Sequence, residues 1–195
     1  AKDEIDSLLK VLDKTISQRP VFAKEKNAVL DELKSQLNNG LSLEEKFRTN
    51  EKIIAEYESF LCDSAIAYIN KNIEIAEKLG NSEFLYQSQL RYSFVLSISG
   101  LFTQALEVLD TIQIGELPEH LKFLYCWTYI RYYENLIKYT DDPKYGDNLL
   151  QKKMQYRDTI MYYLDKNSGM YIKEKAFKLQ DEGKHKEALE ILLKT

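Results

Sequence analysis

The chain has 195 residues, of which 44% are apolar and 30% charged, a composition typical of a folded globular protein. It contains only seven glycines and three prolines. These are too few for the turns that a β-sandwich or barrel needs about every 8–12 residues, so the composition favours an all-α fold. The net charge of −4 argues against a surface built mainly to bind nucleic-acid phosphates.

Helix-starting and helix-ending signals divide the chain into ten predicted helices. Pro20 suits the first turn of a helix, and Gly40 and Gly80 follow periodic stretches as C-terminal glycines do. The segment 42–45 (SLEE) is a capping box, whereas Pro143 is expected in a loop. Between these signals, apolar residues recur every three or four positions. The predicted helices span residues 3–18, 21–38, 43–60, 63–79, 83–99, 101–113, 119–139, 146–165, 169–182 and 184–194.

Two segments of the chain repeat one another. Ser93–Leu109 (SFVLSISGLFTQALEVL) and Ala176–Leu192 (AFKLQDEGKHKEALEIL) are identical at seven of 17 positions. In each copy a glycine ends the first predicted helix, and an alanine follows it five residues later in the second. Internal repetition on this scale is typical of stacked helix pairs that bury a continuous core.

The repeated positions share side-chain size as well as spacing. They are a small residue in the first helix (Ser93, Cys126, Ala176), a glycine at the turn (Gly100, Gly183), an aromatic two residues later (Phe102, with His185 as a weaker match) and an alanine in the second helix (Ala65, Ala105, Ala188). This pattern resembles the tetratricopeptide repeat (TPR). The resemblance implies a right-handed superhelix of about five antiparallel helix pairs, forming one domain over residues 1–195. Within it, residues 1–39 form a possible cap and 43–194 the repeat pairs, with the loosest match over 119–165, where Gly146 lies nearest to the expected alanine.

A more specific resemblance covers most of the chain. An opening leucine-rich helix pair is followed by FLCDSAIAYINKNIEIAEKLGN and then by LRYSFVLSISGLFTQALEVLDTI. This order is similar to the N-terminal region of certain bacterial membrane-bound transcription regulators, in which a secreted repeat ectodomain precedes a transmembrane helix and a cytoplasmic helix-turn-helix region. The resemblance implies that the chain is a fragment of a longer protein and lies on the periplasmic side of the inner membrane. A cytoplasmic location is the alternative.

Sequence motifs for catalysis, metal binding and cofactor binding are missing from the chain. It has no phosphate-binding glycine loop, no zinc-protease motif and no nucleophile elbow. His120 and His185 are 65 residues apart and lack partners at metal-ligand spacing. Carboxylates such as those of Asp181 and Glu182 are expected on solvated helix faces. Cys62 and Cys126 are expected to be buried thiols that form no disulfide. We therefore expect no enzyme activity, no metal and no cofactor.

The residue that follows each small repeat position is aromatic: Phe94, Trp127 and Phe177. In the TPR pattern this position faces the concave groove. The resemblance therefore implies a groove lined by these three rings, and residues one turn away extend the predicted site. The full predicted groove consists of Leu90, Phe94, Phe123, Trp127, Arg131 and Phe177. The chaperone-binding TPR proteins carry a carboxylate clamp of Lys, Asn and Arg at such positions, and apolar residues replace it here. The alternative is that the rings pack on neighbouring repeats.

Three functional hypotheses are compatible with the sequence. The first is a non-enzymatic module that binds a peptide or protein segment and acts as the sensor ectodomain of a membrane-bound regulator. The second is a structural scaffold or self-association segment, including a homodimer. The third is an intracellular peptide-sensing regulator, although residues 1–39 lack the basic helix that DNA recognition needs. We expect this region to make no direct contact with nucleic acid, and to be linked to a membrane only through downstream segments.

Overall fold

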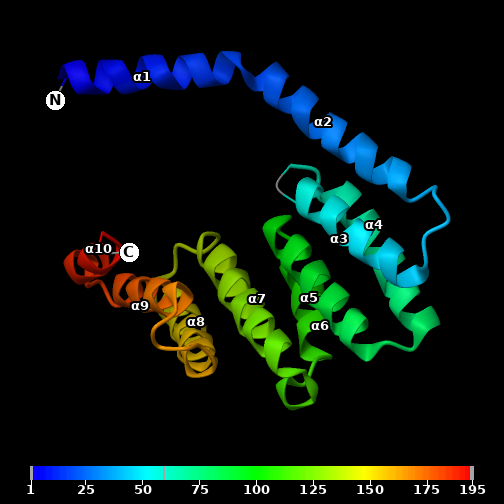
Figure 1. Cartoon of the computed structure of the whole chain (residues 1–195). Helices are drawn as coiled ribbons and strands as arrows, with labels where there is room; N and C mark the ends of the chain where they lie inside the picture. Colours follow the sequence, from blue (N-terminus) through cyan, green and yellow to red (C-terminus); the bar gives the residue numbers. More distant parts are fainter. Residues whose placement is uncertain (1, 59, 194–195) are drawn as a thin grey trace. The chain divides into compact units, whose positions relative to one another are not determined.

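The computed structural model describes residues 2–58 and 60–193, with side chains from Ile5 onward. This part of the chain contains ten α-helices, one short 3-10 helix and no strand, which confirms the all-α prediction. The elements are α1 (Lys2–Ser17), α2 (Arg19–Gln36), α3 (Leu43–Tyr57), α4 (Cys62–Leu79), α5 (Ser82–Ile98), α6 (Phe102–Asp110), η1 (Ile114–Glu116), α7 (Glu119–Ile137), α8 (Pro143–Tyr163), α9 (Gly169–Asp181) and α10 (His185–Leu192) (Figure 1).

The internal contacts of the chain define two compact units, residues 1–68 and 69–195, whose boundary lies inside α4. Each unit is described by itself. The prediction of a single domain over 1–195 stays a prediction. None of the helices within the described residues combines the length and the apolar character needed to cross a membrane.

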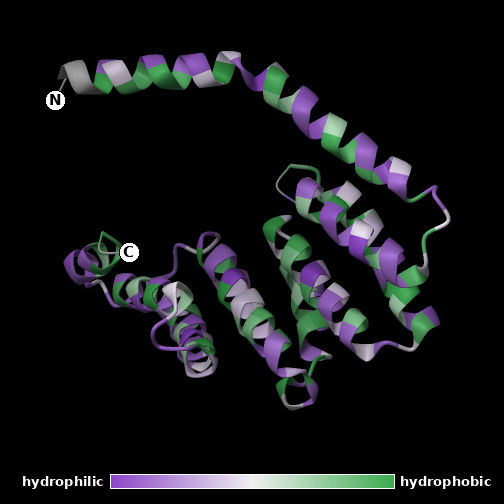
Figure 2. Ribbon diagram, viewed as in Figure 1, coloured by the Kyte–Doolittle hydropathy of each residue, from purple (hydrophilic) through white to green (hydrophobic). Residues whose placement is uncertain are grey.

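In the first unit, α1 and α2 do not fold back on one another. They follow each other with a bend (Figure 1), because the single residue Gln18 joins them in a helical conformation (φ −84°, ψ −3°) and leaves no loop for a reversal. The first of the five predicted antiparallel helix pairs is therefore not formed by α1 and α2. The apolar stripe of α1 is more than half exposed along its whole length, and Figure 2 shows its apolar and polar residues alternating. The stripe consists of Ile5, Leu8, Leu9, Leu12 and Ile16.

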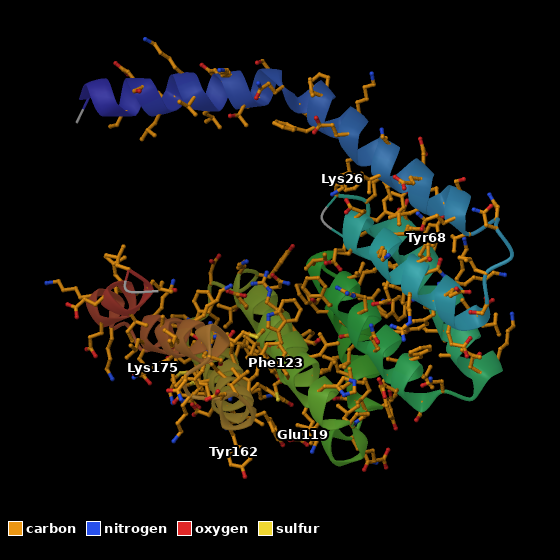
Figure 3. The ribbon with its side chains drawn as sticks, viewed as in Figure 1. Lys26, Tyr68, Glu119, Phe123, Tyr162 and Lys175 are labelled. Atoms are coloured by element: carbon orange, nitrogen blue, oxygen red, sulfur yellow. The ribbon has the colours of Figure 1, made fainter. Side chains whose placement is uncertain are left out.

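The core of the first unit forms where α2 packs on α3. Leu30 of α2 and Phe47 and Ile54 of α3 are almost completely buried. At the edge of this core, Lys26 (Figure 3) lies with its Nζ 4.6 Å from the centre of the Phe60 ring. The start of α4 adds to this core, since Ala65 is fully buried and the Tyr68 ring stacks on that of Tyr57 with the centres 6.1 Å apart.

Local capping explains where two helices begin. The predicted capping box is present, since Ser42 N donates to Glu45 Oε2 at 2.9 Å and Glu45 N donates to Ser42 Oγ at 3.3 Å, so α3 begins at Leu43. The prediction of a loop at Pro143 is wrong, because α8 begins there and Asp142 caps it by accepting from the Tyr145 N–H at 2.8 Å. Proline fits the first helical position, where no backbone donor is required.

The two sequence repeats have the same structure. Gly100 and Gly183 adopt φ values of 80° and 77°, and the chain leaves each first helix through the same two backbone hydrogen bonds. In the first copy Gly100 N donates to Ser97 O and Leu101 N to Leu96 O, the Schellman pattern that a residue with positive φ permits. The second helix of that copy, α6, ends at Asp110 rather than at 113, and the short helix η1 follows it.

Small residues bring the helices of each repeat close together, as predicted. Ser93 and Ala105 are fully buried, and Ser93 Oγ donates to the Ala105 carbonyl at 2.9 Å across the pair. Ala176 and Ala188 are buried at the equivalent contact of α9 with α10. A larger side chain at either contact has no free space.

Replacing Ala105 with leucine should lower the free energy of unfolding by about 1–3 kcal/mol, because the added atoms overpack the α5–α6 contact. Urea denaturation measures the change. Gln104→Leu is the matched control, since Gln104 is the exposed neighbour on the same helix, and its effect should stay within about 0.5 kcal/mol. If the two variants were equally stable, Ala105 would not lie in the α5–α6 contact as described.

The pair α7–α8 is built differently, by stacked tyrosines. The rings of Tyr129 and Tyr156 lie parallel with their centres 4.1 Å apart, and Tyr125 and Tyr133 pack around them. Burial raises the pKa of the Tyr129 and Tyr156 hydroxyls. Large rings thus fill the space between α7 and α8, whereas small residues bring the helices together in the α5–α6 and α9–α10 pairs. This difference accounts for the loose repeat match over 119–165.

The two cysteines differ in exposure. Cys126 is fully buried in α7, as predicted, and burial raises the pKa of its thiol to about 12. Cys62 is only partly buried at the first residue of α4, so the prediction of two buried thiols is wrong for Cys62. The Cys62 side chain lies at the end of a helix, and the neighbouring side chains of Phe60 and Leu61 are themselves exposed. It is therefore less buried than a side chain in the middle of a packed helix.

Cys126 should react with a maleimide only after the protein unfolds, because its thiol is both inaccessible and un-ionised at neutral pH. The measurement is mass spectrometry of the Cys62→Ser variant, labelled in native buffer and in guanidinium chloride. Labelling in native buffer at the rate seen in guanidinium chloride would show that α7 is not packed as described.

Candidate ligand-binding groove

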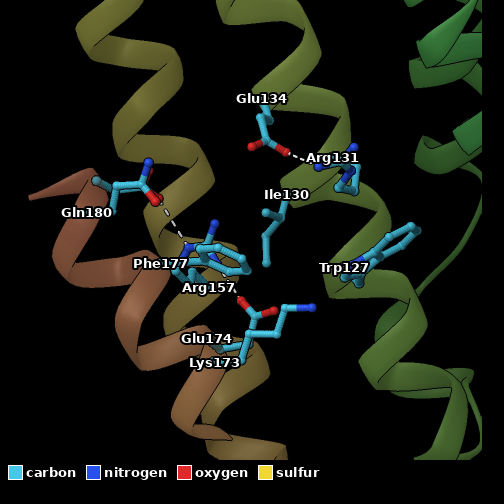
Figure 4. A pocket seen from close by; sticks show the side chains of 10 residues that line it. Trp127, Ile130, Arg131, Glu134, Arg157, Lys173, Glu174, Phe177 and Gln180 are labelled. Carbon is cyan, nitrogen blue, oxygen red and sulfur yellow. Dashed lines mark hydrogen bonds and ion pairs between the residues drawn. The ribbon is translucent and has the colours of Figure 1, made fainter. Parts of the chain in front are cut away.

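A cavity of about 390 Å³ lies between α7 and α9 in the second unit, with α8 behind it (Figure 4). Helices α7 and α9 are the first helices of two consecutive pairs, and the cavity therefore lies where the TPR pattern places its groove. α7 contributes one wall, α9 the opposite wall and α8 a single arginine. The lining residues are Trp127, Ile130, Arg131, Glu134, Arg157, Lys173, Glu174, Phe177, Gln180 and Asp181.

Aromatic side chains with cations beside them form the two walls. The Arg131 guanidinium lies 5.9 Å from the centre of the Trp127 ring and forms an ion pair with Glu134 one turn further along α7. On the opposite wall, the Arg157 guanidinium lies 5.5 Å and the Lys173 Nζ 5.8 Å from the centre of the Phe177 ring. Each ring thus already has a cationic neighbour.

A buried ion network forms the base of the cavity. Arg157 pairs with Glu174 through Nη1, and its Nε donates to Asp181 Oδ2 at 3.1 Å. Lys153 Nζ donates to the other oxygen of Asp181 at 2.6 Å. The side chains of Arg157 and Glu174 are only 5% and 10% exposed. Burial raises the pKa of the Glu174 carboxyl above its usual value, although the positive charge of Arg157 acts in the opposite direction.

A second hollow of about 300 Å³ continues the cavity along the same two helices. It shares Trp127, Lys173 and Glu174 with the first, and its remaining lining is mainly apolar. Together the two hollows form the α7–α9 groove, which follows α7 from Phe123 to Glu134. At 1.5 Å per residue this length is about 16 Å. The residues that line only the second hollow are Arg91, Phe123, Leu124 and Met170.

The structure brings together four of the six residues predicted for the groove. Trp127, Arg131 and Phe177 line the first hollow, and Phe123 lines the second with Trp127. Phe94 lies behind Trp127, with the ring centres 5.0 Å apart, and supports that wall from α5.

Leu90 does not line the groove, and its prediction is wrong. Its side chain is fully buried because it lies on the α5 stripe that carries Ser93 and Ser97, which are also buried. Leu90, four residues before Phe94 on the same helix, therefore lies in the core and does not line the groove.

The expectation of a groove lined by three rings and other apolar residues also needs correction. Charged side chains separate Trp127 from Phe177 in the cavity, and Asp181 is a member of the buried network rather than a solvated surface carboxylate. Sequence reasoning missed Arg157 and Glu174 because charged residues are usually exposed. One signal was present in the sequence: Glu174 and Asp181 are seven residues apart and thus share one face of α9.

The histidines take no part in the groove. His120 Nε2 lies 3.1 Å from Glu83 Oε1 on the surface, and His185 is exposed at the start of α10. Within the described residues, no three side chains of the metal-binding types are gathered so that they could hold a metal ion.

The model of one protein family, described as the SusR N-terminal TPR domain, matches residues 16–195. The chain belongs to this family. The match confirms the predicted TPR-like repeats. No curated protein matches the chain, and no solved structure does. TPR domains are in general non-catalytic modules that bind peptides or proteins, so the family assignment makes this chain a protein-interaction module.

Proposed function

We propose that the α7–α9 groove binds a peptide segment, and that the domain is the sensor ectodomain of a membrane-bound transcription regulator on the periplasmic side of the membrane. The observation that carries the proposal is the cavity between the first helices of two consecutive repeats, with Trp127 on one wall and Phe177 on the other. The resemblance of the sequence to the N-terminal region of bacterial membrane-bound transcription regulators supports the regulatory role.

The dimensions and composition of the groove suit a peptide. Its two hollows, about 390 and 300 Å³, are within the range of ligand-binding clefts. A length of about 16 Å accommodates about five residues of an extended chain at 3.3 Å per residue. Tryptophan and arginine are the residues most often found as binding anchors, and Trp127 and Arg131 lie side by side here.

A second candidate function is self-association, and exposed apolar side chains at two helices favour it. The stripe on α1 is exposed, and Leu189, Leu192 and Leu193 are exposed in and after α10. Neither surface overlaps the α7–α9 groove. Peptide binding and self-association therefore involve different residues and can be tested independently.

Trp127→Ala and Phe177→Ala should each weaken peptide binding at least tenfold, because each removes one wall of the groove. The ligands are peptides selected from a displayed random 12-residue library against the parent chain, and the affinity is measured by fluorescence anisotropy. Tyr162→Ala is the matched control, since the Tyr162 side chain is 84% exposed on α8 and away from the groove (Figure 3). Circular dichroism verifies that each variant is folded.

Two results would contradict the binding proposal: selected peptides that bind all three variants as tightly as the parent chain, or no selected peptide at all. The periplasmic location is tested separately. For this test, alkaline phosphatase is fused after the last residue of this region in the gene that encodes the protein. The phosphatase is active only after export. Activity in intact cells is expected, and an inactive but intact fusion protein would favour the cytoplasmic alternative.

A further inference from the structure

The apolar stripe of α1 is left uncovered by the described residues of the first unit. Every side chain from Ile5 to Glu25 is exposed, so α1 packs on no core along its length. An isolated helix of 16 residues is only marginally stable in water, and helices in proteins gain most of their stability by covering an apolar face. The family match begins at residue 16, so most of α1 lies outside the matched region. The stripe therefore requires a partner other than the core of its own unit.

The polar face of α1 argues against a lipid surface as this partner. Helices that lie on membranes are rich in lysine and arginine on their polar face. The described part of α1 instead has equal numbers of acidic and basic residues, namely Asp6, Lys10, Asp13 and Lys14. A protein surface is therefore the better match.

The spacing of the stripe is self-complementary. Ile5, Leu9, Leu12 and Ile16 are separated by steps of four, three and four residues, the spacing at which two helices pack in a coiled coil. The order of these four side chains is the same when the helix is read from either end. Two copies of α1 that run in opposite directions therefore place Ile5 opposite Ile16 and Leu9 opposite Leu12. All four layers of such a pair are apolar.

The charges of the segment favour the same antiparallel arrangement. In the sequence, residues 2–9 contain one lysine and three acidic residues, a net charge of −2, whereas residues 10–19 contain three basic residues and one acidic residue, a net charge of +2. An antiparallel pair brings each acidic half beside the basic half of the other copy, and a parallel pair would bring like charges together. Asp6 and Asp13 share one flank of the stripe, and Lys10 lies between them at the spacing that allows ion pairs with both.

We infer that α1 forms an antiparallel pair with α1 of a second copy of this chain, about a two-fold axis that passes midway between Leu9 and Leu12. The inference rests on self-association, the second candidate function, and adds the surface and its orientation. Because a two-fold contact uses the same surface of both copies, association stops at the dimer. The contact uses no residue of the α7–α9 groove.

The test is sedimentation velocity of the 195-residue chain from about 5 to 500 µM, a range suited to a small interface. The parent chain should show a reversible monomer–dimer equilibrium without larger species. Leu9→Lys and Leu12→Glu should each weaken dimerisation at least tenfold, because each places an unpaired charge in an apolar layer. Both side chains are about half exposed in a single copy, at 51% and 52%, so neither change disturbs the folded core.

An equimolar mixture of the two variants tests the orientation. In an antiparallel pair the new lysine of one copy lies opposite the new glutamate of the other, and the symmetry-related layer keeps both leucines. The mixture should therefore dimerise to within about threefold of the parent chain. In a parallel pair each new charge would face a leucine, and mixing would restore nothing. Val11→Lys is the matched control, because Val11 is 60% exposed on α1 but lies outside the stripe, and it should dimerise as the parent chain does.

The possible failures separate the proposals. A chain that stays monomeric at every concentration would overturn both the inference and the self-association candidate, without bearing on peptide binding. A dimer that tolerates Leu9→Lys and Leu12→Glu but is lost in Leu189→Lys would be held by α10, so self-association would stand and the inference would be wrong. A dimer that both α1 variants weaken but that mixing does not restore would refute the antiparallel orientation. If the chain sediments with phosphatidylglycerol vesicles and Leu12→Glu releases it, the stripe contacts lipid and the inference fails.

Discussion

Replacing Arg157 with alanine should lower the free energy of unfolding of the second unit by about 3–5 kcal/mol, which is the usual cost of removing one partner from a buried ion pair. Glu174 would lose its ion-pair partner while remaining in a site where its side chain is only 10% exposed. Asp181 would keep Lys153 as its remaining partner. Urea denaturation of the variant and the parent chain measures the difference.

The destabilisation caused by Arg157→Ala should depend on pH. Burial already raises the pKa of Glu174, and removing the neighbouring positive charge raises it further. The folded variant then holds a proton on Glu174 at pH values where the unfolded chain does not. Its stability is therefore greatest below the pKa of an ordinary glutamate and falls as the pH rises through the raised pKa. The loss relative to the parent chain should be larger at pH 8 than at pH 5.

Lys178→Ala provides the control for the Arg157 result. Lys178 pairs with Asp158 between the same two helices, but the two side chains are 31% and 56% exposed. Water screens such a pair, and its removal should cost less than about 1 kcal/mol. If Arg157→Ala and Lys178→Ala have similar effects at neutral pH, the network at the base of the groove is solvated and not buried.

Tyr129→Ala should also lower the free energy of unfolding by about 3–5 kcal/mol, as large-to-small substitutions of buried aromatic residues do. The Tyr129 side chain is 4% exposed, and its ring is stacked on that of Tyr156 in the centre of the α7–α8 contact. Truncation would leave a cavity at the centre of this helix–helix contact. Thermal or urea denaturation gives the size of the effect.

Two further tyrosine variants separate packing from hydrogen bonding. Tyr129→Phe keeps the ring and removes the hydroxyl, which donates to Asp110 Oδ1 at 3.3 Å, so we expect a loss of no more than about 1.5 kcal/mol. Tyr162→Ala removes a ring that is 84% exposed on α8 and should have little effect. A large loss for Tyr129→Phe would mean that the hydroxyl, and not the stacked ring, stabilises the pair.

The parts of the fold that the sequence predicts are those that local chemistry determines. The turns at Gly100 and Gly183 follow from a requirement for positive φ, and the contacts of Ser93 and Ala176 with their partner helices follow from side-chain size. The junction at Gln18 was not predictable in the same way. A short polar linker is compatible with a helical hairpin as well as with a bend, and only the packing of the neighbouring helices decides between them.

The walls of the groove could be predicted from the sequence, whereas its base could not. Trp127 and Phe177 follow directly after the small residues of their repeats, so their direction is fixed by the helix period. Arg157 comes from a helix in the loosely matched pair, and its partners become visible only when α8 and α9 lie side by side. A charge that is neutralised by a distant segment has no signature in the local sequence.

The tyrosine stack on α7 and α8 has an optical consequence. The chain has 14 tyrosines and a single tryptophan, and Trp127 lies on the same helix as Tyr125, Tyr129 and Tyr133. Light absorbed by tyrosines is passed to a nearby indole by resonance energy transfer, and the share contributed by Tyr156 of α8, whose ring stacks on Tyr129, declines when α8 separates from α7. The ratio of emission excited through tyrosine to emission excited directly in the indole therefore reports the integrity of residues 69–195 without any attached label.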